Sequence, residues 1–235
     1  GHRAYVVGDV HGRLDLLEEL LAEIELDVRS SRPEKALLVF LGDLIDRGPN
    51  SASVVELLRL YRYPPLEAVF LLGNHEEVLL RILGGEAQMI ADWRVFGGGE
   101  TLMSYGVEPE AFAGLDQAAS LAVVRKAIPP QHVAFLQSFA DTCRFGDYLF
   151  VHAGIRPGID LDRQKQADLR WIREPFLNDG GDHGFVVVHG HTISSEVEER
   201  SNRIGIDTGA YKTGILTALV IDGEHRRFLT TAANE

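Results

Sequence analysis

The chain has 235 residues and a formal net charge of −12, with 23 Lys and Arg against 35 Asp and Glu. This length suits one sizeable domain, and an apolar fraction of 45% is typical of a globular protein. The acidity argues against a nucleic-acid partner, because phosphate backbones require clustered cationic side chains. No apolar run approaches the roughly 20 residues that cross a bilayer, so we expect no membrane partner either.

The first residues lack a signal-peptide pattern, because the apolar run Ala4–Val7 leads directly into a polar loop. The chain contains a single cysteine, Cys143, which excludes an intramolecular disulfide and a multi-cysteine zinc site. We expect this cysteine to be a structural thiol. These features predict a cytoplasmic protein.

The first third of the chain repeats a short apolar run, a polar loop and an amphipathic segment three times. The expected strands are 3–8, 36–41 and 68–72, and the expected helices are 14–28, 51–61 and a third that ends near Leu83. Such alternation predicts crossover units and a largely parallel sheet. Ligand sites in these sheets lie at the carboxyl ends of the strands, where the polar loops fall.

Residues 84–142 follow a different pattern, rich in Ala and Leu. Helical periodicity is found in 117–126 and 131–139, and Gly97–Gly99 interrupts the segment. We interpret it as a helical insertion within a single domain that spans residues 1–235. Both ends of the insertion adjoin predicted site loops, so we expect it to pack beside the site. There it would shape substrate access without supplying a metal ligand.

Strand character returns after the insertion. The expected strands are 148–151, 185–188, 203–207, 215–221 and 225–229. Asp222-Gly223 lies between the last two and is a hairpin turn signal.

Five loops that follow predicted strands carry Asp, Asn or His side chains. In chain order they supply Asp9 and His11, Asp43 and Asp46, Asn74 and His75, His152, and His189 and His191. Mixed carboxylate and imidazole ligands suit Mn, Fe or Zn better than Ca or Mg. One ion does not need so many ligands, whereas two ions ~3.5–4 Å apart, bridged by a carboxylate, form the arrangement that attacks phosphate esters. One such loop would be ordinary turn chemistry, but five indicate a metal site.

The motifs and their order resemble a known family. They are Gly8-Asp9-Val10-His11-Gly12, Gly42-Asp43-Leu44-Ile45-Asp46-Arg47-Gly48, Gly73-Asn74-His75-Glu76, His152-Ala153-Gly154 and Gly190-His191-Thr192. They resemble the phosphoprotein phosphatase (PPP) branch of the calcineurin-like metallophosphoesterases, in particular its small bacterial and phage type. The resemblance implies an α/β fold, a four-layer α-β-β-α sandwich with the helical insertion.

The resemblance also implies a metal-ligand set. Six side chains would hold two divalent ions, most simply Mn, with Fe or Zn as alternatives. The first ion would be bound by Asp9 and His11, the second by Asn74, His152 and His191, and both by a bridging Asp43. A hydroxide that bridges the ions would attack phosphorus directly, without a phosphoenzyme. His189 is expected to have a structural role.

Catalytic roles follow from the same resemblance. His75 would protonate the leaving oxygen while Asp46 orients its ring. Arg47 would bind phosphate oxygens through its planar guanidinium. A second phosphate-binding arginine is expected at Arg173, because Trp171-Ile172-Arg173 resembles a Trp-x-Arg segment of the phage enzymes. Two other arginines, Arg156 and Arg170, remain alternatives for that role.

The expected reaction is hydrolysis of phosphate monoesters, either small phosphoesters or phosphoprotein carrying phosphate on Ser, Thr or also Tyr. Symmetrical diadenosine tetraphosphate hydrolases share the scaffold and resemble Val151-His152-Ala153-Gly154. Asp46 and Glu76 favour the monoesterase, because dinucleotide hydrolases commonly have a small residue and Asp at those positions. A non-catalytic, metal-stabilised scaffold is the third alternative, and the presence of His75 and Arg47 argues against it.

Overall fold

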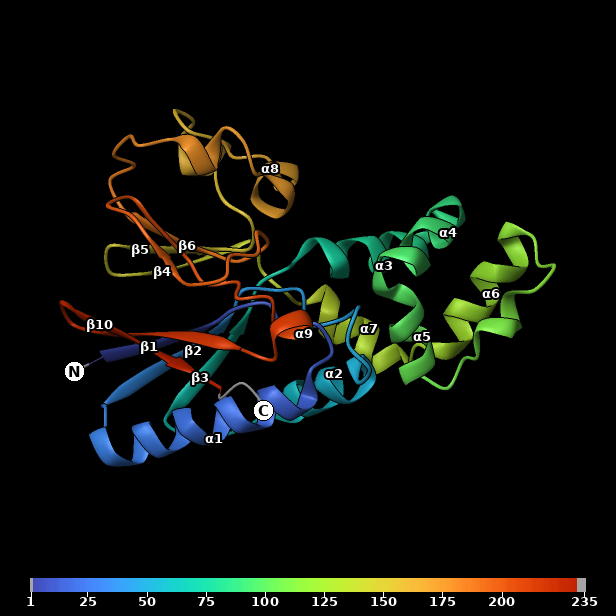
Figure 1. The fold of residues 1–235 in the computed structure, drawn as a ribbon, viewed down its shortest axis with the longest axis horizontal. Coiled ribbons are helices and arrows are strands. Elements are labelled where there is room, and N and C mark those ends of the chain that lie inside the picture. Colours follow the sequence, from blue (N-terminus) through green and yellow to red (C-terminus); the bar gives the residue numbers. More distant parts are fainter. Residues whose placement is uncertain (1, 232–235) are drawn as a thin grey trace.

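The computed structural model describes residues 2–231. Within this range two sheets face each other, and helical segments cover the outer face of each (Figure 1). The strand order is β10-β9-β1-β2-β3 in the first sheet and β4-β5-β6-β8-β7 in the second. The four-layer α-β-β-α arrangement expected from the sequence is confirmed.

The first sheet contains the three repeated units of the sequence. Its strands are β1 (His2–Val7), β2 (Lys35–Phe40), β3 (Leu66–Phe70), β9 (Thr217–Asp222) and β10 (His225–Thr230). Helices α1 (Leu14–Ser31), α2 (Ser51–Leu60) and α3 (Asn74–Gly84) follow the first three strands. The crossovers make β1, β2 and β3 parallel, whereas β9 and β10 form the predicted hairpin and run antiparallel at one edge.

The second sheet is parallel at its centre and antiparallel at both edges. Its strands are β4 (Thr142–Phe145), β5 (Tyr148–Val151), β6 (Val186–His189), β7 (Glu198–Glu199) and β8 (Arg203–Gly205). Over its outer face lie η4 (Leu161–Arg163), α8 (Gln166–Trp171) and η5 (Phe176–Asn178). The sequence did not predict β4, β7 or α8, because these elements are short and carry few apolar side chains.

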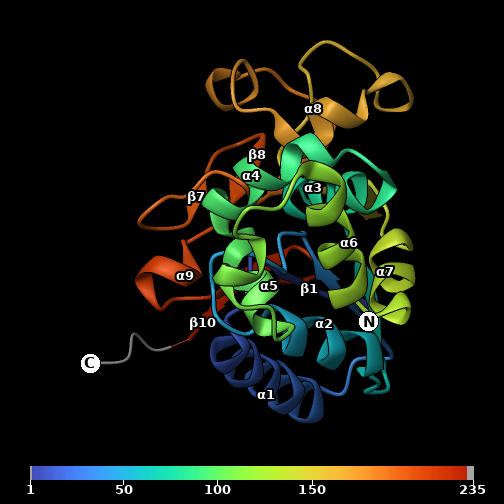
Figure 2. The ribbon, with the colours of Figure 1, turned by 90° about the vertical axis from the view of Figure 1, so that its right-hand side faces the viewer.

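The segment between β3 and β4 is helical and gathers on one side of the two sheets (Figures 1 and 2). After α3 it contains η1 (Ala87–Met89), α4 (Ile90–Trp93), η2 (Arg94–Gly98), α5 (Gly99–Ser104), η3 (Pro109–Phe112), α6 (Gln117–Ala127) and α7 (Pro130–Gln137). A further short helix, α9 (Ala210–Thr213), follows β8. Among residues 2–231, no helix is both long enough and apolar enough to span a membrane.

Three apolar cores hold the four layers together. Successive side chains of a strand point to opposite faces of its sheet. Tyr5 therefore packs toward α1 and α2, whereas Val6 packs between the sheets. Phe150 of β5 enters the same inter-sheet core, and Val151 packs beneath α8. A shift of one residue in strand pairing would move the buried side chains of a strand to the opposite face of its sheet. Burial in these cores therefore fixes the strand register, and the register sets where each strand ends.

Helix α1 provides a test of this layering, because two of its leucines differ in burial. Leu20 is fully buried and Leu26 is 63% exposed. Leu20→Ala should lower the free energy of unfolding by about 2–5 kcal/mol through lost burial and a cavity. Leu26→Ala should change it by less than about 0.5 kcal/mol. Urea unfolding of the two variants measures both values, and equal losses would contradict the assigned core face.

Candidate metal centre

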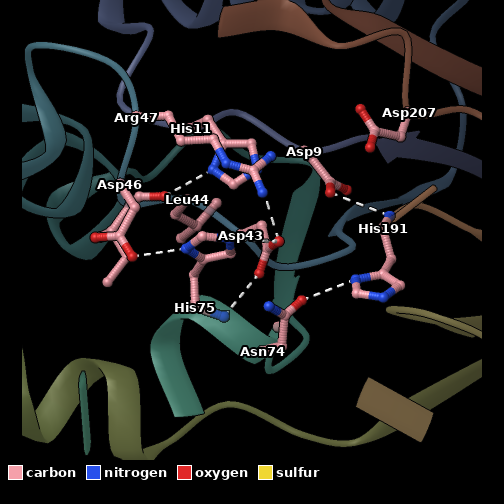
Figure 3. Close-up of polar contacts among 12 residues, drawn as sticks. Asp9, His11, Asp43, Leu44, Asp46, Arg47, Asn74, His75, His191 and Asp207 are labelled. Carbon is pink, nitrogen blue, oxygen red and sulfur yellow. Dashed lines mark hydrogen bonds and ion pairs between the residues drawn. The ribbon is translucent and has the colours of Figure 1, made fainter. Parts of the chain in front are cut away.

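The loops after β1, β2, β3, β5 and β6 meet at one end of the two sheets, with Asp43 among them (Figure 3). Asp43 Oδ2 lies 3.6 Å from Nε2 of His11, and Asp43 Oδ1 lies 3.5 Å from Nε2 of His152. Two groups of possible ligands share this carboxylate, one with His11 and His75 and the other with His152 and His191. Asp43 therefore presents one oxygen to each group, which is the geometry that a bridging ligand requires.

Asn74 joins the second group. Its Oδ1 lies 2.9 Å from Nε2 of His152 and 2.8 Å from Nδ1 of His191. The backbone N–H of His191 donates to Oδ2 of Asp9, which links the loops after β6 and β1. All six metal ligands predicted from the sequence lie in this cluster of contacts, which comprises Asp9, His11, Asp43, Asn74, His152 and His191.

Two buried atoms in the cluster lack a partner that a cation could supply. Oδ1 of Asp9 and Nε2 of His191 have no hydrogen-bond partner, although nearly all buried polar atoms in proteins have one. Burial and the nearby carboxylates of Asp207 and Asp43 raise the pKa of Asp9 well above its usual value. Divalent ions would satisfy these atoms, one ion at Asp9 and the other at His191, and would offset the buried negative charge, so the residues fit a metal centre.

The histidines are held in the form that binds metals. Nδ1 of His11 donates to the carbonyl of Ile45, and Nδ1 of His152 donates to that of Leu41. Because a carbonyl can only accept, each Nε2 keeps its lone pair. Burial lowers the pKa of His11 to about 3 and also lowers that of His152, so both imidazoles remain neutral at physiological pH.

The backbone of the site is strained. Six non-glycine residues among the described 2–231 have positive φ, and five of them are site residues: His11, Asp43, Asp46, Arg47 and His191. Such conformations persist only where surrounding contacts enforce them. Glu76 supplies some of these contacts, since its buried carboxylate accepts the N–H groups of Asp43, Leu44 and Gly73 at 2.8–3.1 Å. Glu76 thus fixes the loop that carries the shared carboxylate.

His75 is oriented by Asp46. Nδ1 of His75 lies 2.6 Å from Oδ2 of Asp46, and that carboxylate also accepts hydrogen bonds from Trp93 and Thr101. Burial opposes a charged imidazole, but the carboxylates of Asp43 and Asp46 outweigh it and raise the pKa of His75 to about 9. His75 therefore carries a proton on Nδ1, while its Nε2 faces Oδ2 of Asp43 at 3.9 Å.

A cavity of about 470 Å³ opens over these residues. It is lined by Asp43, Arg47, Asn74, His75, Val78, Met89, Asp92, Trp93, Phe96, Trp171, Arg173 and His191. Arg47 donates to Nε2 of His11 at 3.0 Å, and Arg173 donates to the carbonyl of His191 at 3.4 Å. The cavity thus places two guanidinium groups beside the metal cluster.

The other two arginines considered from the sequence are paired with carboxylates. Arg156 binds Asp168 at 2.9 Å, and Arg170 binds Asp141 at 2.6 Å. Neither arginine lines the cavity. The geometry therefore favours Arg173 over both alternatives.

The helical insertion contacts the site, as expected. Trp93 of α4 and Thr101 of α5 hold Asp46, and the carbonyl of Gly97 accepts the backbone N–H of Arg47. Neither group of possible ligands found in the described residues includes a residue of 84–142. His189 also lies outside these groups and packs against the ring of Phe176.

Sequence reasoning missed two residues that lie after β8. The carboxylate of Asp207 adjoins Asp9, and its Oδ2 is buried without a hydrogen-bond partner. The ring of Tyr211 packs edge-on against His11 at 5.4 Å, with the guanidinium of Arg47 4.8 Å from its centre. The available signal was a sixth polar loop, Asp207-Thr208-Gly209, after another predicted strand.

Comparisons with known proteins agree with this geometry. A family model described as calcineurin-like phosphoesterase matches residues 2–213. Serine/threonine-protein phosphatase 1 of Salmonella typhimurium (strain LT2) is 31% identical over 221 residues, which cover 91% of this chain and 89% of that protein. The asymmetrical bis(5'-nucleosyl)-tetraphosphatase PrpE of Bacillus thuringiensis (strain Al Hakam) is 27% identical over 232 residues, which cover 91% and 88%.

The fold also matches solved structures. A crystal structure of a candidate diadenosine tetraphosphatase aligns with a TM-score of 0.65 and 24% identity, covering 99% of this chain and 95% of that one. The matches in sequence and fold extend over nearly the whole described chain. The chain therefore belongs to the calcineurin-like phosphoesterases, in their phosphoprotein phosphatase branch, and is a hydrolase of phosphoesters in a family that uses divalent metal ions.

Proposed function

We propose that this enzyme hydrolyses phosphate monoesters of phosphoprotein and uses two divalent ions, most simply Mn²⁺. The observation that carries the proposal is the arrangement around one cavity: a carboxylate, Asp43, shared by two ligand groups, beside an oriented His75. Two arginines, Arg47 and Arg173, line the same cavity. Metal ligands, a proton donor and phosphate-binding cations are the groups that phosphoester hydrolysis requires.

The proposed mechanism assigns a task to each group. Bound ions would supply positive charge and lower the pKa of the attacking water. Arg47 and Arg173 would hold the phosphate oxygens through paired N–H donors. His75 would give the proton on its Nε2 to the leaving oxygen, while Asp46 keeps the Nδ1–H bond and the ring orientation.

Hydrolysis of dinucleoside tetraphosphates is the second candidate. The sequence suggested the symmetrical reaction, whereas the relatives that carry such a name are called asymmetrical. The cavity supports the monoester, because Arg47 and Arg173 are its only cationic lining residues among those described and Asp92 adds a negative charge. Rates on phosphoserine peptide, phosphotyrosine peptide and diadenosine tetraphosphate, measured with Mn²⁺, test the choice. Faster turnover of the dinucleotide would contradict the proposal.

Because Asp43 is shared by both ligand groups, its substitution should change the metal content of the enzyme. Asp43→Asn removes charge from both ligand groups, so both ions should be lost and activity abolished. Asp92→Asn changes an exposed carboxylate of the same cavity and should retain both ions. Elemental analysis of the purified variants measures the difference. A chelator should likewise inactivate the native enzyme and added Mn²⁺ restore it, whereas activity in a metal-free sample would contradict the metal centre.

His75 is predicted to act as an acid rather than as a ligand. His75→Asn should lower kcat on a phosphoserine peptide by about 10²–10⁴, the usual effect of a lost general acid. The loss should shrink on p-nitrophenyl phosphate, whose leaving group needs little protonation. Since His75 lies in one of the possible ligand groups, metal content must be measured on the same sample. Loss of an ion together with the histidine would show that it is a ligand.

Arg173 is predicted to bind the phosphate itself. Arg173→Ala should lower kcat/KM about ten- to a hundredfold on every phosphoester, because a charge-assisted hydrogen bond contributes about 1.5–3 kcal/mol. The matched control is Arg156→Ala, which breaks the part-buried pair with Asp168 away from the cavity and should leave kcat/KM nearly unchanged. Steady-state kinetics on two substrates give the comparison, and equal effects of the two substitutions would exclude the assignment.

A further inference from the structure

Two large aromatic side chains stand exposed at the cavity that holds the site. Phe96 is 68% exposed and Trp171 is 41% exposed, although both line this cavity. They come from different parts of the chain, η2 and the end of α8. Exposed apolar surface that gathers at a polar site often contacts a ligand.

Phe96 is tied to the backbone of a phosphate-binding arginine. The next residue, Gly97, has φ 115°, and its carbonyl accepts the N–H of Arg47 at 3.1 Å. A Cβ at position 97 would lie 2.5 Å from the backbone N of Arg47, so only glycine permits this approach. The contact between Gly97 and Arg47 therefore fixes the backbone next to Phe96.

Trp171 is held in a similar way. It lies two residues before Arg173, and its indole N–H donates to Glu77 of α3 at 3.1 Å. Helix α3 begins at Asn74 and His75, so the indole is attached to the element that carries the proton donor. Phe96 thus precedes the glycine that contacts the backbone of Arg47, and Trp171 lies two residues before Arg173 in the chain.

The charge of the cavity limits which ligands can bind beside the two rings. Its remaining lining side chains outside the metal cluster are Val78, Met89, Trp93 and one acidic residue, Asp92. A polyphosphate chain would meet this carboxylate without a further cation among the described lining residues. The leaving group of a seryl or threonyl ester has no aromatic ring that could pack against Phe96 or Trp171. A neutral aromatic ring attached to the phosphate fills the apolar part of the cavity.

We propose that Phe96 and Trp171 select phosphate esters of an aromatic ring, and that the preferred substrate is phosphotyrosine in a protein. This inference rests on the proposed monoesterase function. The bond between phosphorus and the tyrosyl oxygen breaks, and a bond from phosphorus to a water oxygen forms. His75 supplies the proton that the tyrosyl oxygen takes up, and the products are tyrosine and inorganic phosphate. The two rings contact the leaving group and take no part in the proton transfer.

The test uses one peptide sequence with phosphotyrosine or phosphoserine at the same position and the Mn²⁺-loaded enzyme. The native enzyme should prefer the phosphotyrosine peptide. Phe96→Ala and Trp171→Leu should each lower kcat/KM on that peptide about three- to tenfold, mainly through KM, because an aromatic pair is lost. On the phosphoserine peptide each substitution should change kcat/KM by less than about twofold. The control is Val95→Ala, since Val95 is 82% exposed and does not line this cavity.

A binding measurement separates recognition from turnover. The peptide with a non-hydrolysable aryl difluoromethylphosphonate should lose affinity in both ring variants, whereas the peptide with an alkyl phosphonate should not. Equal losses of affinity for both peptides would contradict selection by the two rings, and so would a native enzyme that does not prefer the aryl ester. Neither result would contradict the proposed monoesterase function. Turnover of diadenosine tetraphosphate without turnover of either phosphopeptide would overturn the proposed function itself.

Discussion

The site depends on one buried carboxylate. Asp43 is 2% exposed, and a buried charge is costly unless other groups compensate it. Here the backbone N–H of His75 donates to Oδ1, three imidazoles face its two oxygens, and Glu76 fixes its backbone. These partners come from different strand ends, so the carboxylate can be accommodated only when the loops have met. The buried charge of Asp43 is therefore compensated only by groups that several loops supply together.

The layered architecture explains why the loops meet. The central strands of both sheets are parallel, so their carboxyl ends point to the same end of the sandwich. The inter-sheet core then sets the distance between the β1–β3 loops and those of β5 and β6. Asp43 follows β2 of the first sheet and His152 follows β5 of the second. The distance between the two side chains therefore depends on how the sheets pack against each other. A substitution of Phe150 in the inter-sheet core would therefore change the distance between the site residues of the two sheets and so alter activity.

The residues predicted for the site lie together in the structure because they occur in short motifs at strand ends. The longer strands and the first three helices follow from local pattern, whereas the short β4 and β7 do not. The side chains proposed as ligands from the resemblance gather around Asp43. The contacts of Asp46 with Trp93 and Thr101 could not be predicted, since 47 and 55 residues separate these partners. No periodicity specifies such a pair. Asp207 was missed for a simpler reason, because it is the last residue of the expected strand 203–207 and was not considered as part of a polar loop.

The hydrogen bonds that Asp46 receives from the insertion have an evolutionary consequence. Trp93 and Thr101 belong to the segment that walls the cavity, yet they also hold the carboxylate that orients His75. A segment that only lined the entrance could be exchanged between relatives to alter substrate choice. In this chain an exchange would also disturb the proton donor, so descent with new specificity requires changes that preserve these two side chains. Substrate access and proton donation are therefore coupled through one segment of this chain.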